Sequence, residues 1–456
     1  MAILGFHVVV CLVAITMISK LLNRSSFIHI FVTNGLYRFM APSNSELKSL
    51  MPPTKEKMSQ RNRRKREEEA EGFNVPKSSP FQLKLIEVDV RDLVNFEMYT
   101  SLHWLTLCVP ICLITFSLSE IYNYALPENK DFNVSIVFLL VVLGFILQML
   151  TALTSYLASN VEERGFMLSI GAVYFLFSFI FTMNVHRVFD IQMLEAYDLL
   201  GNNIAEFIEK SEVFENGTSI QDYRPTNPLM MYISLSIFFS MLSAMLVFPN
   251  FRCALMYLKA LEMDGKIRKL FDHAAFLLPA FILAFFSKPI VYQLVRGPRK
   301  ILSEDQIDIL RIYLILGWLL SKFLTRVSHL QAHLNISYEK VADLRNESGK
   351  VKNYEIQGLI TRYYRYICCA AIQYFGPILL ALFFALLLKV TANISWLGLP
   401  PNSDLPTDLQ TLGPIRFIFN AEICRAFFSF LLVTTLLINF SLQFMGVVYH
   451  TYFVKG

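Results

Sequence analysis

The apolar stretch SIVFLLVVLGFILQMLTALTSYL runs from Ser135 to Leu157 without one acidic or basic side chain. Crossing the hydrocarbon core of a bilayer takes roughly 20 such residues in a helix. Because lipid offers no water to satisfy backbone groups, a continuous apolar run of this length is expected to be helical. Runs of the same character lie at Ala2–Ile18, His103–Ile121, Phe166–Val185, Leu229–Phe248, Ala274–Leu294, Leu310–Leu324, Ile367–Leu388 and Ala426–Val448. The sequence therefore predicts an all-α, polytopic membrane protein with about nine transmembrane helices.

The composition of the whole chain favours the same class. Hydrophobic residues make up 54% of the 456 residues, charged residues make up 17%, and the mean hydropathy is +0.46. A soluble domain would carry about 25% charged residues. The lipid bilayer is thus the predicted surrounding of the chain, and no feature of the sequence points to nucleic acid as a partner.

The distribution of lysine and arginine predicts the orientation in the membrane. With residues 19–98 placed in the cytosol, the cytosolic side carries 29 of these residues and the opposite side 12. Such a bias is typical of the inner side of a membrane. We interpret residues 1–22 as an N-terminal signal anchor, because Lys20 and Arg24 follow the apolar run and no positive charge precedes it. The alternative is a cleaved signal peptide, which would leave eight transmembrane helices.

The predicted domain organisation follows from this topology. Residues 23–100 form a basic, partly disordered cytosolic loop, and residues 101–456 form the helical membrane domain. Within that domain we expect an acidic outer loop at 186–228 and cytosolic helical segments at 249–273 and 326–365. The sequence shows no internal repeat, which argues against an inverted-repeat transporter.

Four local structures are also expected. The segment Phe27–Met40 is amphipathic and is predicted to lie on the membrane surface, while Ser43–Pro80 is predicted to be disordered. Alternating hydrophobicity at Phe81–Asn95 indicates a short strand or an interfacial helix. Pro249 is expected to end the apolar helix before it, with an amphipathic helix following over Phe251–Lys269, because proline lacks the N–H that continues a helix.

Glycosylation sequons give an independent test of orientation. Asn133, Asn216 and Asn393 head sequons that fall outside the cell in the predicted topology. Asn216 lies in the longest outer loop and is the best acceptor of the three, whereas Asn133 is expected to lie close to the bilayer.

Ionisable residues within membrane helices are costly, and each is a candidate functional residue. Glu120, Lys288 and Lys322 lie deepest in the apolar runs. Lys288 precedes Pro289, which is expected to kink its helix and free carbonyl groups that line a polar cavity. An ion pair between Glu120 and either Lys288 or Lys322 is one possibility that the sequence leaves open.

The remaining candidates follow towards the C-terminus. His329 lies four residues before His333, the spacing of two metal ligands on a helix, but no H-E-x-x-H motif and no third ligand accompany them. We therefore expect neither a metal site nor a cofactor, and no enzyme motif is present. Polar candidates within or beside the last apolar runs complete the set: Arg311, Arg326, Gln331, Gln373 and Lys389.

Several stretches resemble the transmembrane protein 161 family. The resemblance is carried by FPNFRCALMYLKAL at Phe248–Leu261, SKPI at Ser287–Ile290, LRIYLI at Leu310–Ile315 and, most specifically, RVSHLQAHLN at Arg326–Asn335. Further matches are QYFGP at Gln373–Pro377, LLLK at Leu386–Lys389 and NISW at Asn393–Trp396. The likeness covers essentially the whole chain, and His333 departs from the aromatic residue expected there.

The resemblance implies a multi-pass membrane protein without known catalytic residues. Family members are associated with the tuning of potassium and calcium currents and with resistance to oxidative stress. The preferred hypothesis is a regulator that binds partner channels or pumps, in the plasma membrane or the endoplasmic reticulum. The alternatives are an ion channel or transporter that uses buried Lys and Glu in kinked helices, and an intramembrane enzyme built on the two histidines.

Overall fold

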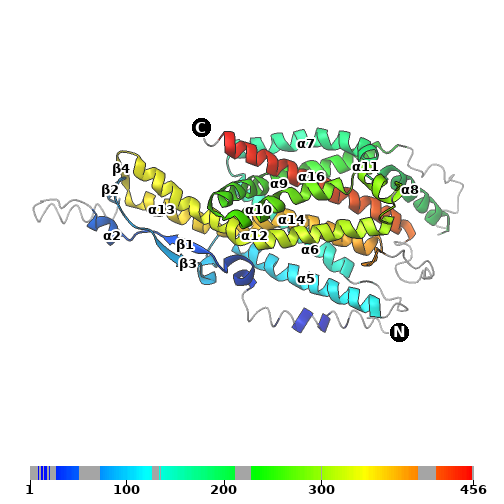
Figure 1. Ribbon diagram of the computed structural model, residues 1–456, viewed down its shortest axis with the longest axis horizontal. Helices are drawn as coiled ribbons and strands as arrows, with labels where there is room; N and C mark the ends of the chain where they lie inside the picture. Colours follow the sequence, from blue (N-terminus) through cyan, green and yellow to red (C-terminus); the bar gives the residue numbers. More distant parts are fainter. Residues whose placement is uncertain are drawn as a thin grey trace, which may run out of the picture.

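Long helices dominate the computed structural model, in which they lie side by side as an elongated bundle (Figure 1). The structure describes residues 27–50, 72–125, 133, 135–210, 227–298, 300–398 and 417–453, and scattered positions between 9 and 20. Six helices are long and apolar enough to cross a membrane: α5 (Tyr99–Ala125), α6 (Ser135–Leu157), α7 (Val161–Val188), α9 (Leu229–Met263), α14 (Ile367–Thr391, counted together with α13, Asn353–Arg365) and α16 (Ala421–Tyr452). The predicted class of helical membrane protein is confirmed.

The predicted number of nine helices is not confirmed. The run Ala274–Leu294 is divided between α10 (Lys266–Ala284), the short α11 (Lys288–Val291) and the π-helix η3 (Tyr292–Arg296). The run Leu310–Leu324 lies inside α12 (Glu304–Asn346). Charged residues at the ends of α10 and along α12 dilute the apolar character on which the prediction relied. Most of Ala2–Ile18 lies outside the described residues.

Helix α14 forms the centre of the bundle. Every residue from Ile367 to Lys389 is buried. No charged residue precedes Lys389 in this helix. Helices α5, α6, α9, α12 and α16 pack around it. A helix that is apolar on all sides is stable only in such a position or in lipid. The axis of the bundle is therefore filled by side chains.

Four of the described helices continue through a proline, and in three of them a neighbouring helix supplies the missing donor. Pro249, Pro279 and Pro377 leave free the carbonyl groups of Met245, Ala275 and Gln373, four residues earlier. These carbonyls accept from the Thr154 hydroxyl at 3.3 Å, the Trp318 indole N–H at 3.0 Å and the Cys253 thiol at 3.4 Å, respectively. Helix α9 thus runs on to Met263, and the predicted break at Pro249 is wrong. The chain turns instead at Asp264 and Gly265.

A small second core lies at one end of the bundle, beyond α10, and joins distant parts of the chain (Figure 1). Its elements are β1 (Tyr37–Met40), α2 (Asn44–Ser49), β2 (Asn74–Pro76), β3 (Lys84–Glu87), β4 (Lys350–Lys352), α13 and the end of α12. The short helix α4 (Val90–Leu93) follows β3 but buries Leu93 in the main core. Strand β1 pairs antiparallel with β3, and β2 pairs antiparallel with β4. The buried residues of this core are Leu47, Phe73, Val75, Phe81, Val341, Ile356 and Ile360. We call this unit the terminal domain.

Several local expectations change in the terminal domain. Phe27–Met40, predicted to lie on the membrane surface, contains the π-helix η1 (His29–Thr33) and strand β1. Ser43–Pro80, predicted to be disordered, contains α2 and β2, and its residues 51–71 lie outside the described part. Phe81–Asn95 contains both the strand and a short helix, β3 and α4. Alternation in short segments does not distinguish these outcomes, because the partner strand comes from elsewhere in the chain.

Helix α12 connects the bundle and the terminal domain. Its 43 residues correspond to about 65 Å at 1.5 Å per residue, twice the thickness of a hydrocarbon core of about 30 Å. Ser303 begins the helix with a capping box, in which its hydroxyl accepts from the N–H of Gln306 while the Gln306 side chain accepts from the Ser303 N–H. Gln331 ties the helix to β1, accepting from the Tyr37 N–H at 2.9 Å and donating to the Tyr37 carbonyl at 3.0 Å.

Candidate functional site

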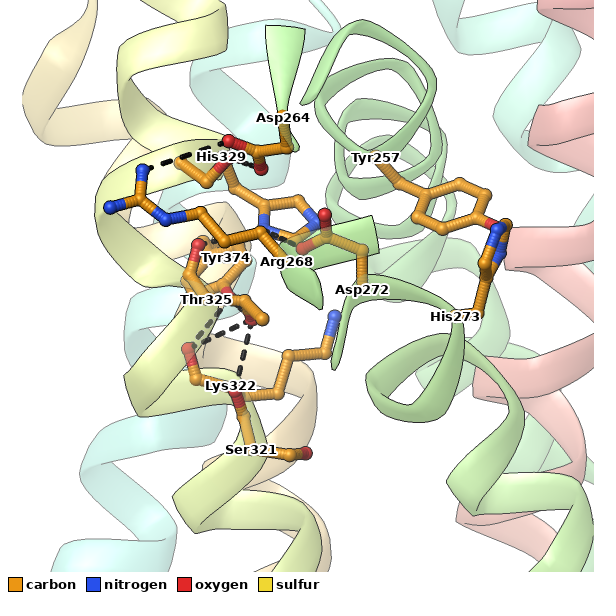
Figure 2. Close-up of polar contacts among 11 residues, drawn as sticks. Tyr257, Asp264, Arg268, Asp272, His273, Ser321, Lys322, Thr325, His329 and Tyr374 are labelled. Carbon is orange, nitrogen blue, oxygen red and sulfur yellow. Dashed lines mark hydrogen bonds and ion pairs between the residues drawn. The ribbon is translucent and has the colours of Figure 1, made fainter. Parts of the chain in front are cut away.

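Lys322 lies in the middle of a buried polar cluster between α10, α12 and α14 (Figure 2). Its ammonium group is 5.0 Å from the ring centroid of Tyr374 on α14. The Tyr374 hydroxyl donates to the Lys322 carbonyl at 2.7 Å and lies 3.0 Å from the Thr325 hydroxyl. These bonds fix α14 against the turn of α12 that carries the lysine. The prediction that Lys322 is a buried cation inside the helical domain agrees with this placement.

Asp272 on α10 supplies the opposite charge. The residue is 1% exposed, and neither carboxylate oxygen has a hydrogen-bond partner within the described part of the chain. In Figure 2 the Lys322 ammonium extends towards this carboxylate. Oδ1 of Asp272 lies 3.8 Å from Nδ1 of His329 on α12. A carboxylate without hydrogen bonds in such a place costs free energy unless a cation or a proton neutralises it.

The electrostatic surroundings predict the protonation states of the cluster. Burial, followed by the nearby Asp264 carboxyl, raises the pKa of Asp272 to about 7. Burial, followed by the positive charge of Lys322, lowers the pKa of His329 to about 3. His329 is therefore neutral at physiological pH, and its Nδ1–H donates to the Thr325 carbonyl at 2.8 Å. Burial also lowers the pKa of Lys322, and the pKa of Asp272 lies near neutrality.

Sequence reasoning missed Asp272, Asp264 and Tyr374. Asp272 stands two residues before the apolar run Ala274–Leu294. A carboxylate so close to an apolar run is the one feature of the sequence that could have marked it as a candidate. Asp264 lies at the turn between α9 and α10, where it accepts from the Ser328 hydroxyl. Because the turn returns α10 towards α12, residues 50 to 60 positions apart meet in one cluster.

The other candidates on α12 and α14 surround the cluster without joining it. The Arg326 guanidinium stacks over Phe323 at 4.3 Å, and its Nε has no hydrogen-bond partner among the described residues. Gln373 Oε1 is likewise buried without a partner in the described chain. The His333 Nε2 group lies 3.1 Å from the Tyr363 carbonyl, away from His329. No group of three or more possible metal ligands occurs in the described residues.

Glu120 belongs to a separate cluster at the opposite end of the bundle. Its carboxylate pairs with Lys389 on α14 and accepts from the Trp396 indole N–H at 2.9 Å. The proposed pairing of Glu120 with Lys288 or Lys322 is therefore wrong, and Lys389 is the partner. Because α5 and α14 are far apart in sequence, periodicity within either helix does not reveal the pair.

Lys288 is exposed, contrary to the prediction of a deeply buried lysine. The chain leaves α10 at Phe285, and α11 begins at Lys288 with Pro289 in its first turn. Pro289 thus starts a helix and does not kink one. Lys288, Pro289 and Arg311 line one cavity of 690 Å³ at this end of the bundle.

The described glycosylation candidates differ in their surroundings. Asn133 caps α6, because its Oδ1 accepts from the Ser135 N–H at 3.1 Å and from the Ser135 hydroxyl at 2.6 Å. Asn393 is exposed just after α14, with a left-handed backbone at φ 53°. Asn216 lies outside the described residues.

Comparison with known proteins identifies the family. No solved structure matches the chain. The family described as "Predicted transmembrane protein 161AB" matches residues 2–410 and 402–454, nearly the whole length. This match confirms the resemblance carried by Phe248–Leu261 and Arg326–Asn335. The chain, a multi-pass membrane protein, belongs to the transmembrane protein 161 family.

Proposed function

We propose that this protein modulates potassium or calcium currents by acting on partner channels or pumps, rather than by conducting ions itself. The observation that carries the proposal is the position of α14, whose residues Ile367–Lys389 are all buried at the centre of the bundle. A pore along the bundle axis would need a polar or hydrated lining. A filled apolar axis favours a role through contacts with another protein.

The terminal domain offers a surface for such a contact. Tyr37, Met40, Leu85 and Ile86 on the paired strands β1 and β3 are exposed apolar residues, with Leu85 58% exposed. The register places Tyr37 and Leu85 on one face of this sheet and Met40 and Ile86 on the other, and exposed apolar side chains of this kind are typical of protein or membrane contact. The charge distribution predicts that this domain lies in the cytosol, where it can reach the cytosolic parts of channels.

The test combines purified protein with cells. Liposomes that contain the folded protein are expected to show no potassium or calcium flux above empty liposomes. In cells that lack the protein, re-expression is expected to restore the potassium or calcium current measured by patch clamp. Leu85→Ser is expected to reduce this restoration, whereas Val94→Ser, a change of a 55% exposed aliphatic residue just after α4 and outside the strands, is the matched control.

The cluster around Lys322 favours transport as a second candidate. A buried lysine beside a carboxylate that titrates near neutrality is typical of proton or ion relays in membrane helices. Flux through liposomes that is lost in Asp272→Asn and kept in Lys266→Met, a change of an exposed lysine, would establish transport and refute the regulatory proposal. Equal loss of current restoration in Leu85→Ser and Val94→Ser would also contradict it.

A further inference from the structure

We propose that the 690 Å³ cavity beside α11 is a binding site for a phosphate ester that carries a primary ammonium group. Its walls come from the segment Asp190–Leu199 with the start of α8 (Met193–Lys210), from α11 and η3, and from the first turns of α12 and α16. Cavities that bind small molecules measure about 300–1,000 Å³. The site is distant from the terminal domain, and the inference is independent of the proposed regulation of currents.

A buried arginine forms the floor of the cavity. Arg311 is 3% exposed, and two parts of its guanidinium group are occupied: Nε donates to the Phe285 carbonyl at 3.1 Å and Nη1 donates to Asp308 at 2.7 Å. The third, Nη2, lies 3.5 Å from Asp190 Oδ2 and has no hydrogen bond within the residues that are described. The ion pair with Asp190 leaves Nη2 without a hydrogen-bond acceptor, and an oxyanion at this point would supply one.

The surrounding fold holds this floor rigid. The Asp190 N–H donates to the Phe286 carbonyl at 2.9 Å, which joins the end of α7 to the break after α10. The Arg311 guanidinium stacks on the Phe286 ring at 4.3 Å. Asp308 also forms an ion pair with the Arg425 Nε at 3.1 Å, so α16 is fixed to α12. A preorganised floor lowers the cost of ligand binding.

The rim of the cavity carries exposed groups of both signs. Lys288 lies on one element of the rim, and Glu195 and Glu422 lie on others. None of these three has an ion pair among the described residues, in contrast to Arg296, which pairs with Glu304 at 3.0 Å. Lys288 and Arg311 together suit a phosphate, which offers several oxygen acceptors and more than one negative charge. Glu195 and Glu422 suit an ammonium group.

Binding of phosphoethanolamine to the full-length protein tests the inference. The protein is purified in detergent, stripped of phospholipid and titrated calorimetrically with phosphoethanolamine, with inorganic phosphate and with ethanolamine. We expect saturable binding of phosphoethanolamine. Inorganic phosphate and ethanolamine are each expected to bind at least about tenfold more weakly. Lys288→Met and Glu422→Gln change exposed side chains and are each expected to weaken binding about tenfold, whereas Lys266→Met and Glu87→Gln, also exposed, are matched controls that leave it unchanged.

Two results would overturn the inference. One is binding of phosphoethanolamine that is no tighter than that of phosphate or ethanolamine alone, and the other is wild-type affinity in both rim variants. The source of the ligand follows from the same titration in nanodiscs. Competition by phosphatidylethanolamine, but not by phosphatidylcholine, would identify a lipid headgroup, and equal affinity in both lipids would identify a free metabolite of this chemistry.

Discussion

Removing the charges of Asp272 and Lys322, singly and together, tests whether the two residues stabilise each other. We expect Lys322→Met to destabilise the protein at alkaline pH, because it leaves the Asp272 carboxylate buried without compensation, whereas Asp272→Asn removes a carboxylate whose ionised form is already disfavoured by burial and is expected to cost less. The double variant is expected to be more stable than the sum of the two losses predicts. A double-mutant cycle isolates this coupling free energy from the separate effects of each change on packing.

Two limits set the size of the coupling. The charged groups do not approach within the 4.0 Å of an ion pair in the described structure, and at 4.0 Å with an effective dielectric constant of 20 the attraction would be about 4 kcal/mol. The second limit comes from protonation of Asp272, whose pKa is about 7. At pH 8.5, neutralising this carboxyl costs about 2 kcal/mol, at 1.36 kcal/mol per unit. The pKa of about 7 already includes the attraction of Lys322, so a variant without the lysine protonates Asp272 more readily, and we expect a coupling below about 2 kcal/mol.

The coupling is measured by unfolding in mixed micelles of increasing SDS content, followed by circular dichroism, at pH 8.5 and at pH 5.5. At pH 5.5 Asp272 carries a proton and the coupling should fall close to zero. The cycle of Asp272→Asn with Lys266→Met, an exposed lysine on the same helix, should give no coupling at either pH. Equal coupling at both pH values, or less than about 0.5 kcal/mol at pH 8.5, would refute the electrostatic interpretation.

Three further outcomes are expected. The pKa of Asp272 is raised in the folded state, so its contribution to stability is present below about pH 4 and is lost as the pH rises through 7. Unfolding curves of the wild type should therefore show a loss of stability over this pH range. Those of Asp272→Asn should not. Glu120→Gln should lower the unfolding free energy by about 3 kcal/mol by leaving the Lys389 ammonium buried without its ion pair, and Lys389→Met in the same background should recover part of the loss. Trp318→Phe should cost about 1 kcal/mol through loss of its indole hydrogen bond, and Pro279→Ala should recover that part by restoring the bond within α10; thermal unfolding of the single and double variants checks this.

The class of the protein was predictable from local sequence, whereas the course of single helices was not. Apolar length alone locates α5, α6 and α7 to within a few residues. Pro249 was expected to end a helix, as it would in water, but the Thr154 hydroxyl supplies the donor that α9 lacks. That donor lies 91 residues from the carbonyl it serves. Only the packing of two helices reveals it.

The candidate site was also predictable only in part, because the partners of its charged residues lie on other helices. The cost of burying a charge makes Lys322 and Lys389 candidates from sequence alone, because Lys322 stands in an apolar run and Lys389 directly follows one. Their partners are on other helices: Asp272 lies just outside a run, and Glu120 is 269 residues from Lys389. Lys288 was misplaced, because the apolar run that includes it is broken at Phe285–Ser287 by turns that its composition does not reveal.

The pairing of β2 with β4 has a consequence for the synthesis of the protein. Val75 lies opposite Val351, so β2 leaves the ribosome long before its partner strand exists. At about 5–20 residues per second, the wait lasts roughly 15–60 s. During this time α5, α6, α7 and α9 are already made and available for insertion, while the apolar side chains of Phe73, Val75 and Phe81 have no core to enter. Nascent chains of this protein can therefore complete the core of the terminal domain only after α13 has been translated.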